Sequence, residues 1–374
     1  MFCNDSERQA GQSNTARIKI MLYEPGTSGH RPIYLRYIIE AFEAKSIQTI
    51  VITEDFAKKP ASLAALAARH GCRLIFVCTL DGLYPWLLQL GFFAKIRRIE
   101  IVGIYYLFNN LSEGWKAVFW GFLLRVRLLA HVFAPDLLME GRPSESGTRQ
   151  ISFLPDPWDA RVLREIDIDL ARSHCNLSGF GGCVFLVFGE ISRRKGIVAL
   201  LDAMGKWDYS RRPDVRVLIA GRVTDEIDSY MASVLKSSPR LREVLVLVSR
   251  WIREEDHSVY FSAASYLCAL YPRGFKVSIS TVIRSFAVRR PVVVGAHGMI
   301  GGIVGSKHAG FVCNTGDEGE VLAALEKAYD CYMLRKSQFW EMALAGEEVA
   351  NLSELKKFRS ILASFIDDWG RVPS

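Results

Sequence analysis

Three consecutive cations stand where a predicted buried strand gives way to a predicted helix. Arg193, Arg194 and Lys195 follow the apolar run CVFLVF and a glycine, and they precede apolar residues at helical spacing. Cations oppose the dipole at the start of a helix, whereas the free N–H groups there favour anions. One interpretation is a solvated turn, in which all three side chains, Lys195 included, face solvent. A phosphate or pyrophosphate ligand explains both the charges and their position, and we favour it.

A second group of candidate phosphate ligands follows a later apolar run, YLCALYP. Two cations occupy the loop after this predicted strand, and three hydroxyl side chains stand at the start of a helix predicted over about 279–289. Hydroxyl groups and free N–H groups at a helix start suit a phosphate. Ordinary N-capping needs one serine, so the set exceeds what capping requires. The residues are Arg273, Lys276, Ser278, Ser280 and Thr281.

A third candidate loop, PGTSGHRP, follows the first predicted strand. Gly26 and Gly29 permit the backbone to approach a ligand closely, and His30 lies beside them. Asp81 in TLDGLYP also follows a predicted strand, where it is either an acid that faces a ligand or a helix N-cap. We assign His30 and Asp81 to the acceptor side of a site.

Several common chemistries lack their motifs in this chain. The glycine loop is not a GxGxxG fingerprint and no Walker lysine motif occurs, which counts against nicotinamide dehydrogenases and P-loop nucleotidases. There is no HExxH motif and no cluster of histidine and aspartate, so we expect no metal site. His297 stands alone in a glycine-rich turn, where a structural role is the more common one.

The composition is that of a globular protein with more than one domain. The chain has 374 residues, half of them hydrophobic and 23% charged, and is too long for one ordinary core. The net charge of +7 suits an anionic small ligand or an acidic membrane surface, and we expect no nucleic acid partner. Eight scattered cysteines without a CxxC pair predict reduced, buried thiols and a cytoplasmic protein. Residues 1–16 are polar, which predicts a disordered tail and no signal peptide.

Predicted strands and helices alternate in two series. The first series has strands at 18–24, 49–53, 73–79 and 98–106, with a helix at 32–45 and a second one at about 61–71. The second has strands at 184–189, 215–221, 244–249, 266–272, 291–295 and 310–314, with helices at 196–206, 225–237, 254–264 and 279–289. Most strands are β-branched runs without alternation, which is typical of buried parallel strands.

This pattern predicts the α/β class, with two doubly wound Rossmann-like domains that face each other across a cleft. We place the domains at 17–158 and 159–350, with two prolines interrupting regular structure in the link. An amphipathic helix follows at 352–370. Ligands of such sheets bind at the carboxyl ends of the strands, where the candidate loops 24–31, 189–196 and 272–281 all lie.

The segment 117–134 is the most apolar of the chain, but Arg125 and Arg127 interrupt it and it falls short of a membrane span. We expect one amphipathic helix here. Its apolar side is either buried in the core or rests on a membrane surface. We favour the buried helix, but neighbouring cations keep the second alternative open, and from it we predict a peripheral contact through 94–127, at the inner face of the membrane.

The chain resembles the family 4, or group 1, glycosyltransferases of the GT-B fold. The segments that carry the resemblance are YEPGTSGHRPIYLRYIIEAF, FGEISRRKGIVALLDAM, VLIAG, WIREEDHSVYFSAASYLCALYP, RRPVVVGAHGMIGGIV and HAGFVC. The resemblance implies an acceptor-side N-terminal domain, a donor-binding C-terminal domain and a last helix that returns to the first domain. It also implies retaining, metal-independent transfer from a nucleotide sugar, with no further cofactor.

The resemblance also assigns donor residues. Lys195 matches the lysine that holds the donor pyrophosphate. Glu190 stands where the family usually has an arginine, so Arg193 or Arg194 would take that role.

One departure from the family concerns its two glutamates, which lie eight positions apart near the donor sugar and ribose. Here those positions are Lys276 and Arg284, and the Ser278–Ser280 segment resembles a serine-rich version found in one branch.

We therefore predict a glycosyltransferase that moves a sugar from a nucleotide-diphosphate sugar to a glycan, a lipid carrier or a small metabolite. The loss of both glutamates keeps an alternative open. In it, the chain is an inactive GT-B-like protein that binds a nucleotide or glycan, or pairs with an active enzyme. A nucleotide-sugar epimerase of the same fold has little support.

Overall fold

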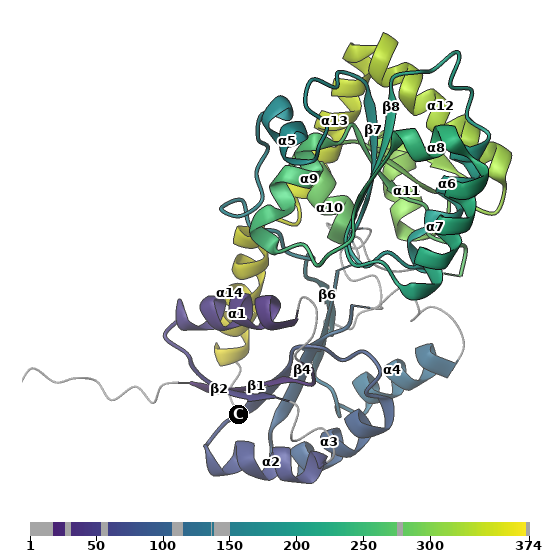
Figure 1. The fold of residues 1–374 in the computed structure, drawn as a ribbon. Coiled ribbons are helices and arrows are strands. Elements are labelled where there is room, and N and C mark those ends of the chain that lie inside the picture. Colours follow the sequence, from purple (N-terminus) through teal and green to yellow (C-terminus); the bar gives the residue numbers. More distant parts are fainter. Residues whose placement is uncertain are drawn as a thin grey trace, which may run out of the picture.

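The apolar runs of the sequence assemble into two separate parallel sheets of six strands each (Figure 1). The computed structural model describes residues 18–26, 31–53, 59–106, 115–135, 137, 150–274 and 280–371, and the structural statements below concern those residues. Every strand pair in both sheets is parallel. The chain thus belongs to the α/β class, as predicted.

The first sheet has the strand order β2-β1-β3-β4-β5-β6. Its strands are β1 (Lys19–Glu24), β2 (Gln48–Thr53), β3 (Leu74–Val77), β4 (Glu100–Ile104), β5 (His131–Ala134) and β6 (Ile151–Phe153). The helices around it are α1 (Arg31–Glu43), α2 (Pro60–Arg69), α3 (Tyr84–Ile96), α4 (Trp115–Arg125) and the last helix of the chain, α14 (Leu355–Arg371). One core cluster joins α2, α3 and α4 to one face of the sheet, and another joins α1 and α14 to the other face.

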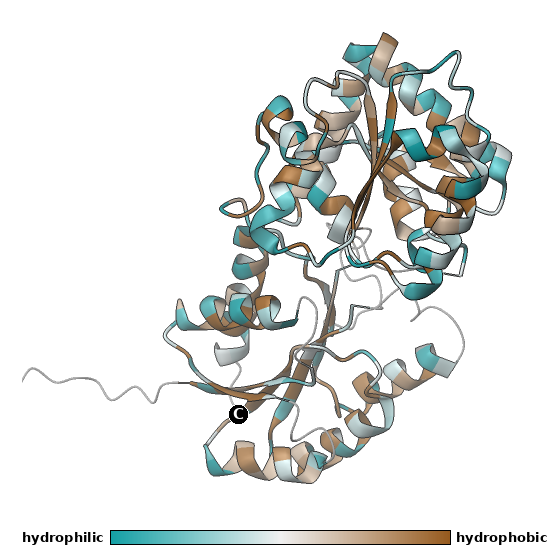
Figure 2. Cartoon of the chain, viewed as in Figure 1, coloured by the Kyte–Doolittle hydropathy of each residue, from teal (hydrophilic) through white to brown (hydrophobic). Residues whose placement is uncertain are grey.

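The second sheet has the strand order β12-β11-β10-β7-β8-β9. Its strands are β7 (Cys183–Phe188), β8 (Val215–Ala220), β9 (Leu245–Val248), β10 (Tyr266–Ala269), β11 (Val292–Gly295) and β12 (Gly310–Cys313). Its helices are α5 (Ile168–His174), α6 (Ile197–Gly205), α7 (Asp225–Ser237), α8 (Pro239–Val244), α9 (His257–Ala263), α10 (Ser280–Ala287), α11 (Gly298–Lys307), α12 (Glu318–Leu334) and α13 (Lys336–Asn351). Figure 2 shows the strands at the centre of this domain as apolar.

The chain passes between the two sheets twice, and the two passages lie side by side. The backbone N–H of Trp158 donates to the Ser353 carbonyl, and the N–H of Leu355 donates to the Trp158 carbonyl. The indole N–H of Trp158 also donates to the Ala350 carbonyl, at 2.7 Å. Beyond this crossing, α14 packs on α1 and the first sheet through Phe358 and other apolar residues.

The prediction of one helix over 117–134 is wrong. Helix α4 ends at Arg125, and the chain turns and enters β5 at His131. Arg127 adopts a left-handed backbone with a φ of 55°, which ends helical structure. The apolar residues of the segment therefore divide between a surface helix and a buried strand. No helix within the described part of the chain is long and apolar enough to cross a bilayer.

The seven cysteines within the described ranges are all buried and none forms a disulfide, in agreement with the prediction of reduced thiols.

Candidate functional site

The carboxyl ends of both sheets lie where the two domains meet, between β6 and the second sheet (Figure 1). Tyr34 lies in the first turns of α1, directly after the loop that follows β1. Its side chain hydrogen-bonds with Arg284 on α10, which follows β10. We call the region around this contact the domain junction. It gathers the ends of strands from both sheets, which is where ligands of such sheets bind.

Glycines shape the loop after β7 that holds the three cations. Gly196 has a φ of +71°, and a Cβ there would lie 1.9 Å from the carbonyl oxygen of Leu270 at the end of β10. Gly221 after β8 has a φ of +147°, and its Cβ would lie 1.6 Å from the Gly189 carbonyl oxygen. Only glycine fits these two positions. The loop after β7 is therefore pressed against the ends of both neighbouring strands.

This close fit buries Lys195 rather than leaving it in solvent. Its Nζ lies 3.3 Å from the hydroxyl of Tyr271 and 5.5 Å from the centre of that ring, and only 8% of the residue is exposed. The alternative interpretation, a solvated turn in which Lys195 faces solvent, is thus wrong. The reason is Gly196, which brings the loop against the end of β10.

Tyr271 connects the two groups of predicted phosphate ligands. Its hydroxyl lies 3.3 Å from Lys195 Nζ and 3.3 Å from the Thr281 hydroxyl in the first turn of α10. Burial raises the pKa of Tyr271, but the ammonium of Lys195, the hydrogen bond from Thr281 and the nearby Arg194 outweigh it and lower that pKa. Sequence reasoning missed this residue. Its position directly after a predicted strand was the available signal.

The two arginines of the loop differ in their surroundings. Arg193 is 60% exposed at its side chain and forms an ion pair with Glu226 on α7. Arg194 is exposed, and its charge reaches Tyr271. Glu190 is paired with Arg222 at 3.5 Å. Of the three cations, Lys195 is therefore the one in contact with Tyr271.

The remaining candidates of the second group begin α10. Ser280 is 6% exposed at the first residue of the helix, and Thr281 follows it. Lys276 and Ser278 lie outside the described residues. Thr281 thus comes together with Lys195 through Tyr271, at a helix N-terminus whose dipole favours an anion.

Arg284 is buried in the domain junction, with 5% of its surface exposed. Its charge interacts with the carboxylates of Asp156 and Glu254 and with the phenol of Tyr34. Burial lowers the pKa of a guanidinium, but these three groups outweigh it and raise the pKa of Arg284. For Asp156, an acid, burial has the opposite effect. It raises the pKa of this carboxyl group, although Arg284 and Tyr34 act to lower it. The position at which the resemblance implies a glutamate thus holds a buried cation beside two acids.

On the acceptor side, Glu24 organises the start of the glycine loop. It is the last residue of β1 and 2% exposed, with hydrogen bonds from the Gly26 N–H at 3.2 Å and the Thr79 hydroxyl at 3.0 Å. Arg31 approaches it to 3.9 Å. Burial is the largest effect on this carboxyl group and raises its pKa from 4.5 to about 6. The sequence analysis missed Glu24, an acid at the carboxyl end of an otherwise apolar strand.

Asp81 lies near this group, at the end of the loop after β3. Its carboxylate accepts a hydrogen bond from the Tyr106 N–H at 3.1 Å, whereas the N-cap residue of α3 is Leu83. Asp81 therefore does not cap the helix that follows it. Gly29 and His30 lie outside the described residues, while Gly26 is held by Glu24.

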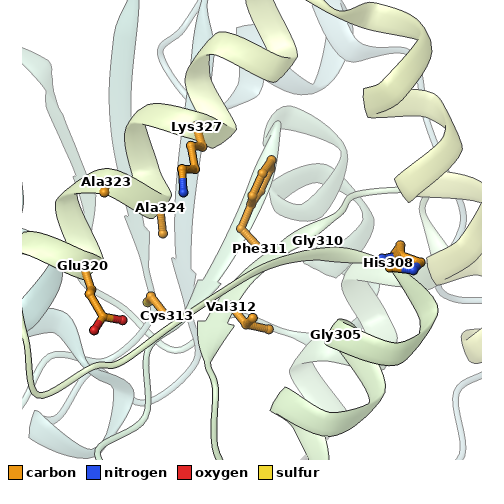
Figure 3. Close-up of a pocket in the computed structure, with 10 residues that line it drawn as sticks. All are labelled: Gly305, His308, Gly310, Phe311, Val312, Cys313, Glu320, Ala323, Ala324 and Lys327. Carbon is orange, nitrogen blue, oxygen red and sulfur yellow. The ribbon is translucent and has the colours of Figure 1, made fainter.

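A cavity of about 330 Å³ lies away from the junction, along the edge strand β12 (Figure 3). Residues of α11, β12 and α12 line it, among them His308, Phe311 and Lys327. None of the predicted site residues contributes to this cavity.

The comparisons with known proteins agree with this geometry. Residues 182–331 match the family model described as glycosyl transferases group 1. Among curated proteins, no relative matches the sequence. Among solved structures, sucrose-phosphate synthase from Thermosynechococcus elongatus is similar, with a TM-score of 0.70 and 16% identity over 95% of this chain and 99% of that one.

Two further structures have the same arrangement. A glycosyltransferase from Rickettsia africae has a TM-score of 0.69 at 10% identity, over 96% of this chain and 100% of that one. HepE from Anabaena, solved in complex with UDP-glucose, has a TM-score of 0.67 at 14% identity, over 94% and 100%. At these low identities, the TM-scores show a common fold. The second domain thus matches the group 1 glycosyl transferases, and the whole chain has the two-domain GT-B fold of glycosyltransferases.

Proposed function

We propose that the protein is a glycosyltransferase that uses a nucleotide-diphosphate sugar as donor. The observation that carries the proposal is the Lys195–Tyr271–Thr281 connection at the start of α10. It places an ammonium, two hydroxyl groups and a helix N-terminus together at the carboxyl ends of β7 and β10. Such a set suits the two phosphates of a nucleoside diphosphate. HepE, which shares the fold, was solved with UDP and with UDP-glucose.

In the proposed reaction, the bond between the anomeric carbon and the β-phosphate oxygen breaks and the acceptor oxygen bonds to that carbon. The acceptor proton is released, and the nucleoside diphosphate departs with the additional negative charge. Lys195 and Arg194 would stabilise that charge, because a buried ammonium is most effective where charge develops in the transition state. Glu24 and Asp81 lie on the acceptor side, where a glycan, a lipid carrier or a small metabolite would bind.

The stereochemical outcome and the metal requirement belong to the same proposal. The resemblance to the family supports retention, and the cations of the loop after β7 supply positive charge to the diphosphate without a metal ion. Lys276 and Ser278 complete the proposed set of donor-binding residues.

Incubation with UDP-, GDP- and TDP-sugars, with and without acceptors, tests the function through the release of nucleoside diphosphate. Proton NMR of the product's anomeric position would identify retention or inversion.

A second candidate function is a protein of this fold that binds nucleotide or glycan without transfer. The burial of Arg284 against Asp156 and Tyr34 favours it, because a residue held in this way is not free to replace a ribose-binding glutamate. Calorimetry of nucleoside diphosphate binding, together with the turnover assay on the sugar panel, separates the two functions. Binding of a nucleoside diphosphate without turnover of any sugar in the panel supports the second, and turnover excludes it.

A further inference from the structure

Helix α3 exposes a stripe of large apolar side chains. Leu88, Phe92 and Ile96 are 40%, 57% and 62% exposed. They are four residues apart, so they lie on one side of the helix. The opposite side of α3 packs in the core through Leu87 and Leu90.

Helix α4 has a matching stripe. Trp115, Val118 and Phe122 are 61%, 73% and 49% exposed, at spacings of three and four residues. Its core-facing residues include Trp120 and Leu123, which are buried. Both helices thus turn apolar side chains toward solvent on the side away from the first sheet. Figure 2 colours much of both helices as apolar.

The two helices lie side by side, so their stripes belong to one surface. At their starts, the rings of Tyr84 and Trp115 are 5.1 Å apart. At their ends, Lys95 Nζ donates to the Val126 carbonyl at 2.8 Å. We call the surface formed by the two stripes the α3–α4 face. An apolar surface of this extent on a folded domain marks an interaction site.

The helices that form the α3–α4 face and the turns after them carry cations and no acids. Neither 82–99 nor 115–130 contains an aspartate or glutamate. Five of the six cations in these ranges are exposed and the sixth is partly exposed; they are Lys95, Arg97, Arg98, Lys116, Arg125 and Arg127. Five of the six lie in the last turn of a helix or directly after it.

We propose that the α3–α4 face binds the surface of an anionic phospholipid bilayer. Apolar side chains would enter the boundary of the acyl chains, with Trp115 at the level of the headgroups. Lysine and arginine reach the lipid phosphates from the same face through their long apolar stems. A second copy of the chain would bring six cations against six, so charge complementarity favours the bilayer.

This proposal does not depend on glycosyl transfer, because vesicle binding is measured without donor or acceptor. The experiment is sedimentation of the full chain with phosphatidylcholine vesicles, with and without phosphatidylglycerol, at low and high salt. We expect binding to the anionic vesicles at low salt, weaker binding at high salt and little binding to phosphatidylcholine alone. Absence of binding to anionic vesicles at low salt would overturn the proposal.

Variants connect the binding to the α3–α4 face. The pair Arg125→Gln and Arg127→Gln is expected to lower the partition coefficient about 25-fold, about fivefold for each charge. Phe92→Ser with Phe122→Ser should lower it at least as far. Matched controls on the second domain are Arg211→Gln with Lys307→Gln, and Leu334→Ser with Leu344→Ser, which change residues that are also exposed. Equal loss in the controls would overturn the proposal.

Sedimentation velocity without vesicles tests whether a second copy of the chain, rather than a bilayer, covers the α3–α4 face. We expect the wild type and the Phe92→Ser, Phe122→Ser variant to sediment alike, with thermal unfolding midpoints that agree because both side chains are exposed. A wild-type dimer that the variant abolishes would assign the α3–α4 face to a second copy and overturn the bilayer proposal.

Discussion

The Nζ of Lys195 lies 3.3 Å from the hydroxyl of Tyr271, at the point where the loop after β7 meets the end of β10. Lys195 is the buried member of three adjacent cations. A buried ammonium beside a phenol and an adjacent helix N-terminus would suit an anion. This relationship is the basis of the first two predictions.

Lys195→Ala is expected to weaken nucleoside diphosphate binding by about 10- to 150-fold. The reason is the loss of a charge-assisted hydrogen bond worth roughly 1.5–3 kcal/mol. Affinity for the unphosphorylated nucleoside should stay unchanged, because the ammonium would contact only phosphates. Calorimetric titration of both ligands is the measurement. Arg211→Gln is the matched control, since Arg211 is an exposed cation in the loop before β8, away from the loop after β7. Equal affinities of wild type and Lys195→Ala for the diphosphate would contradict the proposed site.

Tyr271→Phe tests the connection between the two ligand groups. The variant keeps the buried ring but removes the hydroxyl that contacts both Lys195 and Thr281. A hydrogen bond of this kind contributes about 1 kcal/mol, so diphosphate affinity should fall roughly fivefold. Tyr260→Phe is the control, because its hydroxyl contacts Arg250 elsewhere in the same domain. Tighter diphosphate binding by Tyr271→Phe would show that the hydroxyl does not position Lys195 for an anion.

Arg284→Met is expected to lower the free energy of unfolding by about 3–5 kcal/mol, because it leaves Asp156 and Glu254 without their buried cation. Urea denaturation at neutral pH is the measurement. Adding Asp156→Asn to this variant should recover part of the loss, since one of the uncompensated charges is then removed. Additive losses in the double variant would show that the two side chains do not interact.

The sequence was sufficient for the six strands of the second sheet, for four strands of the first and for two residues of the candidate site. Long β-branched runs such as VRVLIA predict buried parallel strands whatever their surroundings, and the loops after them follow from the topology. Lys195 and Thr281 were identified because charges and hydroxyls at a helix start are unusual. Tyr271 was not, because a tyrosine at the end of an apolar run resembles a core residue until its hydroxyl contacts are known.

Other features depend on packing that no local pattern encodes. Glu24 lies in a strand whose other residues are apolar, and only the fold brings Thr79 within hydrogen-bonding distance of it. The division of 117–134 into a helix and a strand follows from the left-handed turn at Arg127, a conformation that a sequence rarely reveals for arginine. The ion cluster around Arg284 joins residues from three distant parts of the chain.

Nucleoside diphosphate binding is expected to persist in EDTA. The cations at the loop after β7 would neutralise the phosphates directly. Removal of divalent ions should therefore change the affinity for the diphosphate by less than about twofold. In free energy, this is less than the ~0.6 kcal/mol that a weak neutral hydrogen bond contributes. Calorimetry in EDTA and in excess magnesium is the measurement. Binding that disappears in EDTA and returns with magnesium or manganese would overturn the metal-independent mechanism.

Glu24 predicts a specific pH dependence of stability. Its pKa is raised from 4.5 to about 6, mainly by burial. Between these pH values the unfolded chain has lost the proton that the folded chain still binds, so the free energy of unfolding falls as the pH rises. The contribution amounts to up to about 2 kcal/mol above pH 6, at 1.36 kcal/mol per pKa unit. Glutamine at position 24 does not titrate, so the free energy of unfolding of Glu24→Gln lacks this decrease with pH.

The measurement is urea denaturation of the wild type and Glu24→Gln at several pH values from about 4.5 to 7. Loss of the carboxylate's hydrogen bonds to Gly26 and Thr79 gives a constant offset, whereas the stability of the variant relative to the wild type should rise with pH by up to about 2 kcal/mol. Glu43→Gln at the exposed end of α1 is the control, and its difference from the wild type should not follow this course. A difference between Glu24→Gln and the wild type that stays constant over this range would show that the Glu24 carboxyl group titrates normally in the folded protein, and that the glycine loop begins at an ionised acid.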